Sequence, residues 1–342
     1  MRSSRRLERR PVHVGAVSAG AQTVPKRLSA GDNHSQRTRR IADAIRSRRS
    51  RGNMDERTVG IGYVLASAVG FGAVGIFGTL GGDIGLSIPT ILAFRFAIAS
   101  AVLWGLLAVQ GRQNLLSGRL LGWAVLLGIG GYGGMSGFYF WGLEYLTAGL
   151  VAIVLFTFPA IVVAATLFTS PDRISGPLVA ALCLSLGGVA LIVGADPAGA
   201  DPRGVVIVLG SAICYAGYML GSERVLESVD PQVLTAHVLP ASGLLFLAIG
   251  AARGTFAVPA ATETTAWIVL TALAMFSTAI PISLLYAGLP KIGASRASII
   301  STAEPAVAVV LGAAVLGEPV TATTVVGGML VVVGVIVIQR RS

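Results

Sequence analysis

The sequence predicts an all-α integral membrane protein with ten transmembrane helices, arranged as two inverted five-helix repeats. Three observations predict this fold: an apolar composition, ten long apolar segments and an internal duplication. The chain is 54% hydrophobic and only 12% charged, whereas an ordinary soluble domain has about 25% charged residues. Together with a mean hydropathy of +0.77, this composition excludes an ordinary soluble globular protein.

Ten apolar stretches are each long enough to cross about 30 Å of hydrocarbon as a helix. They are continuous runs rather than the short alternating segments of a membrane β-barrel, so we expect helices. In chain order the stretches cover residues 59–80, 88–109, 120–141, 145–168, 176–194, 204–222, 232–251, 265–288, 294–316 and 320–338.

The second half of the chain repeats the first. Residues 142–193 align without a gap with residues 288–339, and 12 of the 52 pairs are identical. In both copies a Pro precedes a Gly by 29 residues, and upstream Pro89 aligns with Pro231. Because each repeat contains five crossings, an odd number, the second copy would lie inverted relative to the first. Inverted repeats are typical of secondary transporters, in which one site faces two compartments in turn.

We expect three parts: a tail (1–58), a first repeat (59–194) and a second repeat (204–338). The tail holds 15 Lys and Arg against 5 Asp and Glu, whereas the rest of the chain holds 11 against 11. It has no aromatic residue and no apolar core for a signal peptide. We therefore expect a disordered, Arg-rich cytoplasmic extension. Met54 is an alternative start, in which case residues 1–53 would be an artefact of the gene model.

The loop charges predict the orientation in the cytoplasmic membrane. If the N-terminus is cytoplasmic, two basic residues fall in outer loops, Arg203 and Arg253, and the inner side holds seven, in agreement with the positive-inside rule. The inner basic residues are Arg112, Arg119, Arg173, Arg224, Lys291, Arg340 and Arg341. The outer connections contain the acidic residues Asp83, Glu144, Asp196, Asp201, Glu263 and Glu318. Both termini are thus expected in the cytoplasm.

Three ionisable residues lie inside the predicted spans: Arg95, His237 and Glu304. A charge at the bilayer centre costs at least about 2.5 kcal/mol, so such residues usually face a cavity or a partner. Arg95 and His237 occupy equivalent positions in the two repeats. Hydroxyl and aromatic side chains in spans that would line a cavity complete the candidate substrate site: Tyr132, Tyr139, Thr157, Tyr215, Tyr218 and Ser277. Hydrogen bonding to the backbone is the alternative role for the ionisable residues.

An enzymatic alternative rests on the sequence G-x-S-G around Ser136. With His237 as a base, this serine would make the chain an intramembrane serine hydrolase. A non-transporting membrane scaffold is a third possibility. Two G-x-G-x-x-G sequences lie inside apolar spans, so we interpret them as sites of helix packing rather than dinucleotide binding. No metal-binding or nucleotide-binding motif is present, so we expect neither a metal nor another cofactor.

The residues resemble a known family. The segment Ser301 to Pro305, followed by Gly317-Glu318-Pro319, resembles the second repeat of EamA-type carriers in the drug/metabolite transporter superfamily, and Pro89 with Arg95 resembles the first. The resemblance covers residues 59–338. It implies ten helices with helices 1 to 4 and 6 to 9 around a central cavity. The first repeat has Phe158 where the second has Glu304, so acidic chemistry would be confined to one half.

The resemblance implies a secondary transporter rather than an enzyme. The cargo would be a small organic metabolite, such as an amino acid, nucleoside, amine or drug-like solute, moved by alternating access in the direction of export. The family motifs describe the scaffold and do not select among these solutes. The expected partners are this solute and the lipid bilayer, with no nucleic acid; a homodimer is left open.

Overall fold

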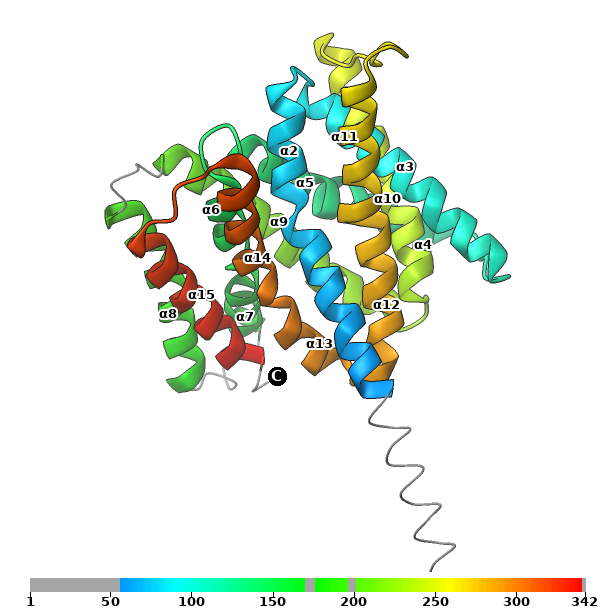
Figure 1. The fold of residues 1–342 in the computed structure, drawn as a ribbon. Helices are drawn as coiled ribbons and strands as arrows, with labels where there is room; N and C mark the ends of the chain where they lie inside the picture. Colours follow the sequence, from blue (N-terminus) through cyan, green and yellow to red (C-terminus); the bar gives the residue numbers. More distant parts are fainter. Residues whose placement is uncertain (1–55, 170–175, 196–200, 340–342) are drawn as a thin grey trace, which may run out of the picture. The chain divides into compact units, whose positions relative to one another are not determined.

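A computed structural model describes residues 56–169, 176–195 and 201–339. Within these ranges the protein is helical throughout and contains no strand. The chain from Met54 onward forms one compact unit, drawn as a bundle of long helices in Figure 1. Our expectations for the Arg-rich tail fall on residues outside the described ranges.

Eight helical segments in the described part of the chain are long and apolar enough to cross a membrane. They are Glu56–Asp83, Ile88–Val109, Gly118–Gly142, Ala148–Ala165, Pro202–Leu226, Pro231–Arg253, Thr264–Ile292 and Arg296–Leu316. Each overlaps one of the stretches predicted from the sequence. Two further helices, α8 (Gly176–Ala195) and α15 (Ala322–Gln339), fall in the remaining two stretches and pack along each other (Figure 1). The protein is therefore a multi-pass, all-α membrane protein.

The helices α3 (Ile88–Val109) and α10 (Pro231–Arg253) begin in the same way and pack against each other. Both have a Pro in the first turn, where a missing N–H costs nothing. The hydroxyl of Ser87 accepts a hydrogen bond from the Thr90 backbone N–H, and the Asp230 carboxylate accepts one from the Gln232 N–H. Such side-chain caps stabilise a helix N-terminus by about 1 kcal/mol.

Three of the predicted continuous spans are interrupted by a turn, and the breaks in the fourth and ninth spans lie at equivalent positions of the two sequence repeats. The fourth span is interrupted by a turn at residues 156–157, just before Pro159. The ninth span is interrupted by a turn at Thr302, three residues before Pro305. A proline lacks the N–H that an α-helix needs and its ring clashes with the carbonyl four residues earlier. The resulting helices are α6 (Ala148–Leu155), α7 (Phe158–Thr169), α13 (Ala294–Ser301) and α14 (Ala303–Leu311).

The third and eighth spans each contain a π-helical segment, and these segments end 146 residues apart, at Gly133 and Ala279. Short π segments are rare and are frequently found at functional sites. After the second one, Pro281 removes the N–H that would bond the Ser277 carbonyl. The third span comprises α4 (Gly118–Leu126), η1 (Leu127–Gly133) and α5 (Gly134–Gly142). The eighth comprises α11 (Thr264–Ala274), η3 (Met275–Ala279) and α12 (Ile280–Ile292).

The remaining spans complete the bundle. The first is a helix over 56–72, a turn at Ala73 and α2 (Val74–Asp83), and the sixth is the uninterrupted α9 (Pro202–Leu226). The ninth span ends in a third π segment, η4 (Gly312–Leu316).

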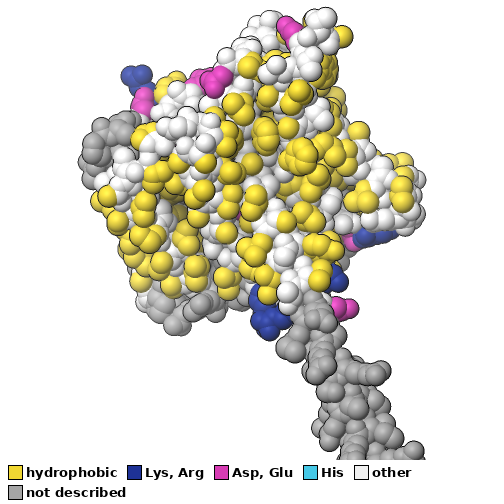
Figure 2. Space-filling view, in the orientation of Figure 1, with side chains coloured by type: hydrophobic (Ala, Val, Ile, Leu, Met, Phe, Trp, Pro, Cys, Tyr) yellow, Lys and Arg dark blue, Asp and Glu magenta, His cyan; other side chains and the backbone are white. Residues whose placement is uncertain are grey.

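The outer surface of the bundle is apolar. Figure 2 shows hydrophobic side chains over most of one face, with acidic side chains near the end where α2 finishes and basic ones mainly near the opposite end. Large apolar residues such as Val206, Leu244 and Ile268 are more than 60% exposed. A wide exposed apolar surface is unfavourable in water but suits contact with lipid.

Glycines permit the closest helix contacts, as the sequence predicted for the G-x-G-x-x-G segments. A Cβ added at Gly128 would lie 2.6 Å from the Ala241 Cβ and 2.7 Å from the Val238 carbonyl oxygen of α10. Two residues later, a Cβ at Gly130 would have nothing within 4 Å. Only one of these two neighbouring glycines therefore determines how closely η1 approaches α10.

We predict that Gly128→Ala lowers the thermal stability of the detergent-purified protein, because the added methyl would force apart two backbones. Overpacking of this kind usually costs about 1 to 3 kcal/mol. Gly130→Ala is the matched control and should leave the melting temperature nearly unchanged. Equal melting temperatures for both variants would contradict this account of the η1–α10 contact.

Candidate functional site

Arg95 lies in the second turn of α3 and points into the interior of the bundle, where its residue is only 3% exposed. Its Nε atom donates a hydrogen bond to the Thr278 hydroxyl oxygen, at 2.9 Å. The Thr278 hydroxyl donates in turn to the Leu273 carbonyl, at 3.2 Å. Thr278 belongs to η3, so the π segment of the eighth span positions the residue that contacts Arg95.

Six aromatic side chains form a group in which two rings contact Arg95 and four more follow through ring-to-ring contacts. We call them the aromatic cluster: Phe96, Tyr132, Tyr139, Phe140, Tyr215 and Tyr218. The guanidinium carbon of Arg95 lies 5.2 Å from the Phe96 ring centre and 5.7 Å from that of Phe140. These distances are typical of cation–π contacts.

The rings of the aromatic cluster form a chain of contacts between the two halves of the sequence. Phe96 lies 5.8 Å from Tyr132, and Tyr132 lies 5.7 Å from Tyr218, measured between ring centres. Tyr218 and Tyr215 are stacked at 6.1 Å. Phe96, Phe140 and Tyr139 are buried, whereas the three other tyrosines are half-buried. The cluster thus joins η1 in the first repeat to α9 in the second.

Glu304 lies in the first turn of α14, immediately after the break in the ninth span. A helix N-terminus favours a carboxylate because unpaired N–H groups and the helix dipole point toward it. The side chain is half-buried and forms a hydrogen bond with the side chain of Ser301. It interacts electrostatically with Tyr132 and Tyr215. The carboxylate therefore lies within electrostatic range of the aromatic cluster.

Arg95 and Glu304 do not pair with each other. In the described ranges the one salt bridge joins Arg112 to Asp230. Two tyrosines, Tyr132 and Tyr139, nevertheless lie within electrostatic range of both residues.

Two hydroxyl residues predicted for the site adjoin the cluster. Ser277 precedes Thr278 in η3, is fully buried, and its hydroxyl has no hydrogen-bond partner among the described residues. Thr157 is also fully buried, and its hydroxyl donates to the Val154 carbonyl at 2.8 Å within the broken fourth span. The next residue, Phe158, contacts Tyr215 with ring centres 4.4 Å apart.

The contacts of His237 lie apart from the aromatic cluster. Its Nε2 atom accepts a hydrogen bond from the Leu116 backbone N–H, at 3.1 Å, and its Nδ1 atom lies 2.8 Å from the Val233 carbonyl oxygen. Because a backbone N–H can only donate, Nε2 must be unprotonated and Nδ1 carries the hydrogen. The Trp104 ring packs edge-on against the imidazole at 4.9 Å. His237 is thus a neutral residue that fastens the 110–117 loop to α10.

These contacts leave the hydrolase alternative without support. Both nitrogens of His237 are occupied by backbone groups, so neither is free to accept a proton from a serine. Ser136 is buried, and its hydroxyl contacts the Met135 sulfur at 3.9 Å. No hydrogen bond joins Ser136 to His237 within the described residues.

A contact between the two halves that the sequence did not predict involves Glu318. The residue lies in the connection before α15, as predicted, and its carboxylate accepts hydrogen bonds from the backbone N–H groups of Ala148, at 2.7 Å, and Gly149, at 3.3 Å. It therefore caps the N-terminus of α6 from 170 residues away in the sequence. Gly312 lies so close to this carboxylate that an added Cβ would overlap it. The segment Gly317-Glu318-Pro319 was noted from the sequence, but nothing in it identifies the helix that is capped.

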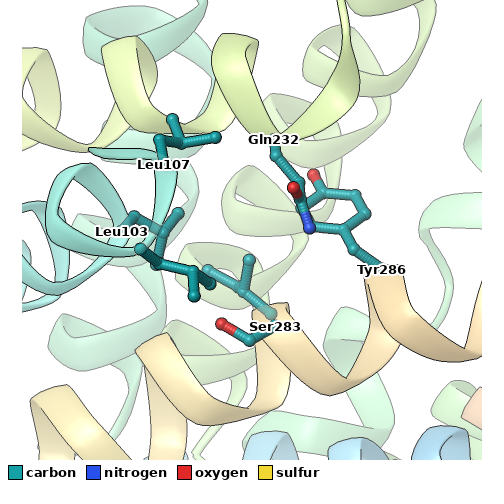
Figure 3. Close-up of a pocket in the computed structure, with 7 residues that line it drawn as sticks. Leu103, Leu107, Gln232, Ser283 and Tyr286 are labelled. Atoms are coloured by element: carbon teal, nitrogen blue, oxygen red, sulfur yellow. The ribbon is translucent and has the colours of Figure 1, made fainter. Parts of the chain in front are cut away.

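A shallow pocket opens between α3, α10 and α12, beside the aromatic cluster. Figure 3 shows Gln232 and Tyr286 close together on one side of it and Leu103 and Leu107 of α3 on the other. The Tyr286 hydroxyl lies 2.6 Å from the Thr235 hydroxyl, which also hydrogen bonds with Tyr218 of the cluster. A polar path thus connects the pocket with the aromatic cluster.

The comparisons with known proteins agree with this arrangement of helices. A relative from Archaeoglobus fulgidus, named an uncharacterized transporter, is 27% identical over 261 residues, which are 75% of this chain and 90% of the relative. The threonine/homoserine exporter RhtA of Escherichia coli K12 is 28% identical over 242 residues, 68% of this chain and 75% of the exporter. A solved crystal structure, 19% identical with a TM-score of 0.58, matches 83% of this chain and 98% of its own length, a likeness in fold alone.

The sequence model of the EamA-like transporter family matches the chain twice, over residues 58–194 and 202–340. The family and the named relatives are transporters rather than enzymes. These two matches together span most of the chain. The protein therefore belongs to the EamA-like transporter family.

Proposed function

We propose that the protein is a secondary transporter that exports a small organic solute across the cytoplasmic membrane by alternating access. One observation carries this proposal: the contacts that build the site cross from one repeat to the other. Arg95 bonds Thr278, Tyr132 contacts Tyr218, and Phe158 contacts Tyr215. A site between two repeats is exposed to either side of the membrane when one repeat rocks against the other.

Ten helices in two inverted repeats, 59–194 and 204–338, form the scaffold of this proposal. Four features support it: the twofold family match, the equivalent breaks in the fourth and ninth spans, the equivalent π segments, and the paired helices α8 and α15. Discontinuous helices near the midplane are typical of transporters, because their free backbone groups and half-helix ends bind solutes or ions. The loop charges support cytoplasmic termini.

The proposed binding site comprises Arg95, Glu304, the half-buried tyrosines Tyr132, Tyr215 and Tyr218, and the neighbouring Tyr139, Thr157 and Ser277. Its aromatic rings offer apolar surfaces on which a solute can stack, and Arg95 and Glu304 offer a basic and an acidic group. His237 is proposed to act from outside the site, by holding the 110–117 loop on α10. The scaffold alternative lacks a reason for two unpaired charges inside the bundle, since each is costly there.

The solute class is broad: an amino acid, a nucleoside, an amine or a drug-like molecule. L-Threonine is the first solute to test, because a relative that matches two thirds of the chain is named a threonine/homoserine exporter. Saturable flux of a small organic solute into liposomes containing the purified protein would support the proposal. A broad panel of solutes without saturable flux would favour the scaffold alternative.

We predict that Glu304→Gln separates the two roles that a carboxylate can have at this position. If Glu304 carries protons, the variant should still exchange labelled solute across the membrane but lose accumulation driven by a pH gradient. If Glu304 binds a cationic group of the solute, the half-saturation concentration should rise about tenfold or more, as expected for a lost buried charge pair. Flux is normalised to folded protein in each case.

Glu223→Gln, an exposed change on α9, is the matched control. It should behave as the unmodified protein in both assays. Unchanged kinetics of Glu304→Gln in both assays would remove Glu304 from the site, and lowered thermal stability with normal flux would make it a structural residue.

A further inference from the structure

Arg95 has hydrogen-bonding capacity that the protein does not use. A guanidinium group has five N–H donors, but in the described part of the chain Arg95 makes a single hydrogen bond, from Nε to Thr278. The two terminal nitrogens donate none. Their positive charge has no carboxylate partner, because the one salt bridge in that part of the chain lies elsewhere, at Arg112.

An unpaired, buried guanidinium is costly in a membrane protein. The rings of Phe96 and Phe140 attract the cation but accept no conventional hydrogen bond in its plane. A ligand that supplies an acceptor for the terminal nitrogens would offset this cost. The arrangement therefore indicates a site that is completed by an anionic ligand.

We propose that Arg95 binds a carboxylate of the transported solute through its two terminal nitrogens. This inference rests on the proposed transport function and names the chemical group that the solute must carry. A guanidinium matches a carboxylate with two parallel N–H···O bonds, a geometry that a lysine cannot reproduce. With Nε held by Thr278, the terminal edge of the group keeps a fixed direction.

The charge of the site favours a carboxylate over a phosphate. Every other Lys and Arg in the described ranges is at least partly exposed, so Arg95 is the single buried cation there. One cation neutralises a monovalent carboxylate, whereas a doubly charged phosphate would need a second positive group. Ser277, the residue before Thr278, is uncharged and brings no second positive group to this contact.

The aromatic cluster accounts for the rest of such a solute. Half-buried Tyr132 contacts Phe96, which lies under the guanidinium, so a solute bound at Arg95 would extend along these rings. Stacking on aromatic faces accepts many organic groups. The aromatic cluster is therefore expected to accept many solute side chains, whereas Arg95 requires that the solute carry an anionic group.

The test uses matched pairs of probes that differ at the carboxylate: L-threonine with L-threoninamide, and L-phenylalanine with L-phenylalaninamide. Binding to the purified full-length protein and flux in liposomes are both measured. We expect at least one acid to bind and to be carried, with at least tenfold weaker binding of its amide. Arg95→Gln should remove this preference, and Arg95→Lys should restore it only in part because the lysine lacks the two-pronged geometry.

A second readout separates binding from a structural role. Arg95→Met replaces the unpaired cation with an apolar side chain of similar length, so the unliganded variant should melt at the same temperature as the unmodified protein or higher. A structural Arg95 would instead give a lower melting temperature or a protein that does not fold, and either result would overturn the inference. Arg253→Gln, an exposed change at the end of α10, is the control and should alter neither binding nor melting.

Failure of the inference differs from failure of the proposed function. If acids and amides are carried equally well, or if Arg95→Gln leaves the preference for the acid intact, the protein is a transporter but Arg95 does not bind a carboxylate. If no solute in these pairs or in a broad panel shows saturable flux, the proposed function fails and the inference fails with it.

Discussion

The interior of this bundle is organised around one buried cation. Arg95 is 3% exposed inside the bundle, and the neighbouring elements accommodate its charge. The π segment η3 presents the Thr278 hydroxyl to Nε, and Phe96 and Phe140 provide ring faces on either side. Because these groups leave the terminal nitrogens free, they orient the charge without neutralising it. The proposed binding role of Arg95 rests on that combination.

Irregular backbone occurs where the site needs it. In a membrane, unpaired backbone groups are tolerated only inside the protein or along a cavity. Breaks at 156–157 and at Thr302, and the segments η1 and η3, all border the aromatic cluster or carry its neighbours. The uninterrupted helices α3 and α9 carry Arg95 and the tyrosines Tyr215 and Tyr218. The irregular spans position Glu304, Tyr132 and Thr278.

Much of the fold was predictable because long apolar runs have one stable form in lipid. The eight apolar spans, and the close contacts made by Gly128, followed from composition and spacing. The two breaks were not predicted, although the prolines that cause them had been aligned, because an apolar run of normal length gives no signal that a helix is interrupted. The π segments were missed for the same reason.

The candidate site was predicted in part. Arg95 and Glu304 were identified because a charge is costly to bury in a membrane. Their partners, however, depend on packing between distant spans, and the two residues do not form an ion pair with each other. Repeat symmetry made His237 seem equivalent to Arg95, yet the backbone of the 110–117 loop occupies its Nε2 atom. Glu318 lies in a loop, as predicted, but charge alone does not reveal that its carboxylate caps a helix of the other repeat. A single sequence does not show which residues of one repeat contact which residues of the other.

Alternating access around the site is the central claim, and distances between spin labels test it most directly. After both cysteines are replaced by alanine, one pair of labels is placed at Glu144 and Glu263, at the end of the bundle where α11 begins, and another at Arg119 and Lys291, at the opposite end. All four positions are exposed. On addition of a solute that the protein carries, the account predicts that one distance lengthens while the other shortens, by several ångströms. Distances that stay fixed, or that change in the same direction at both ends, would contradict it.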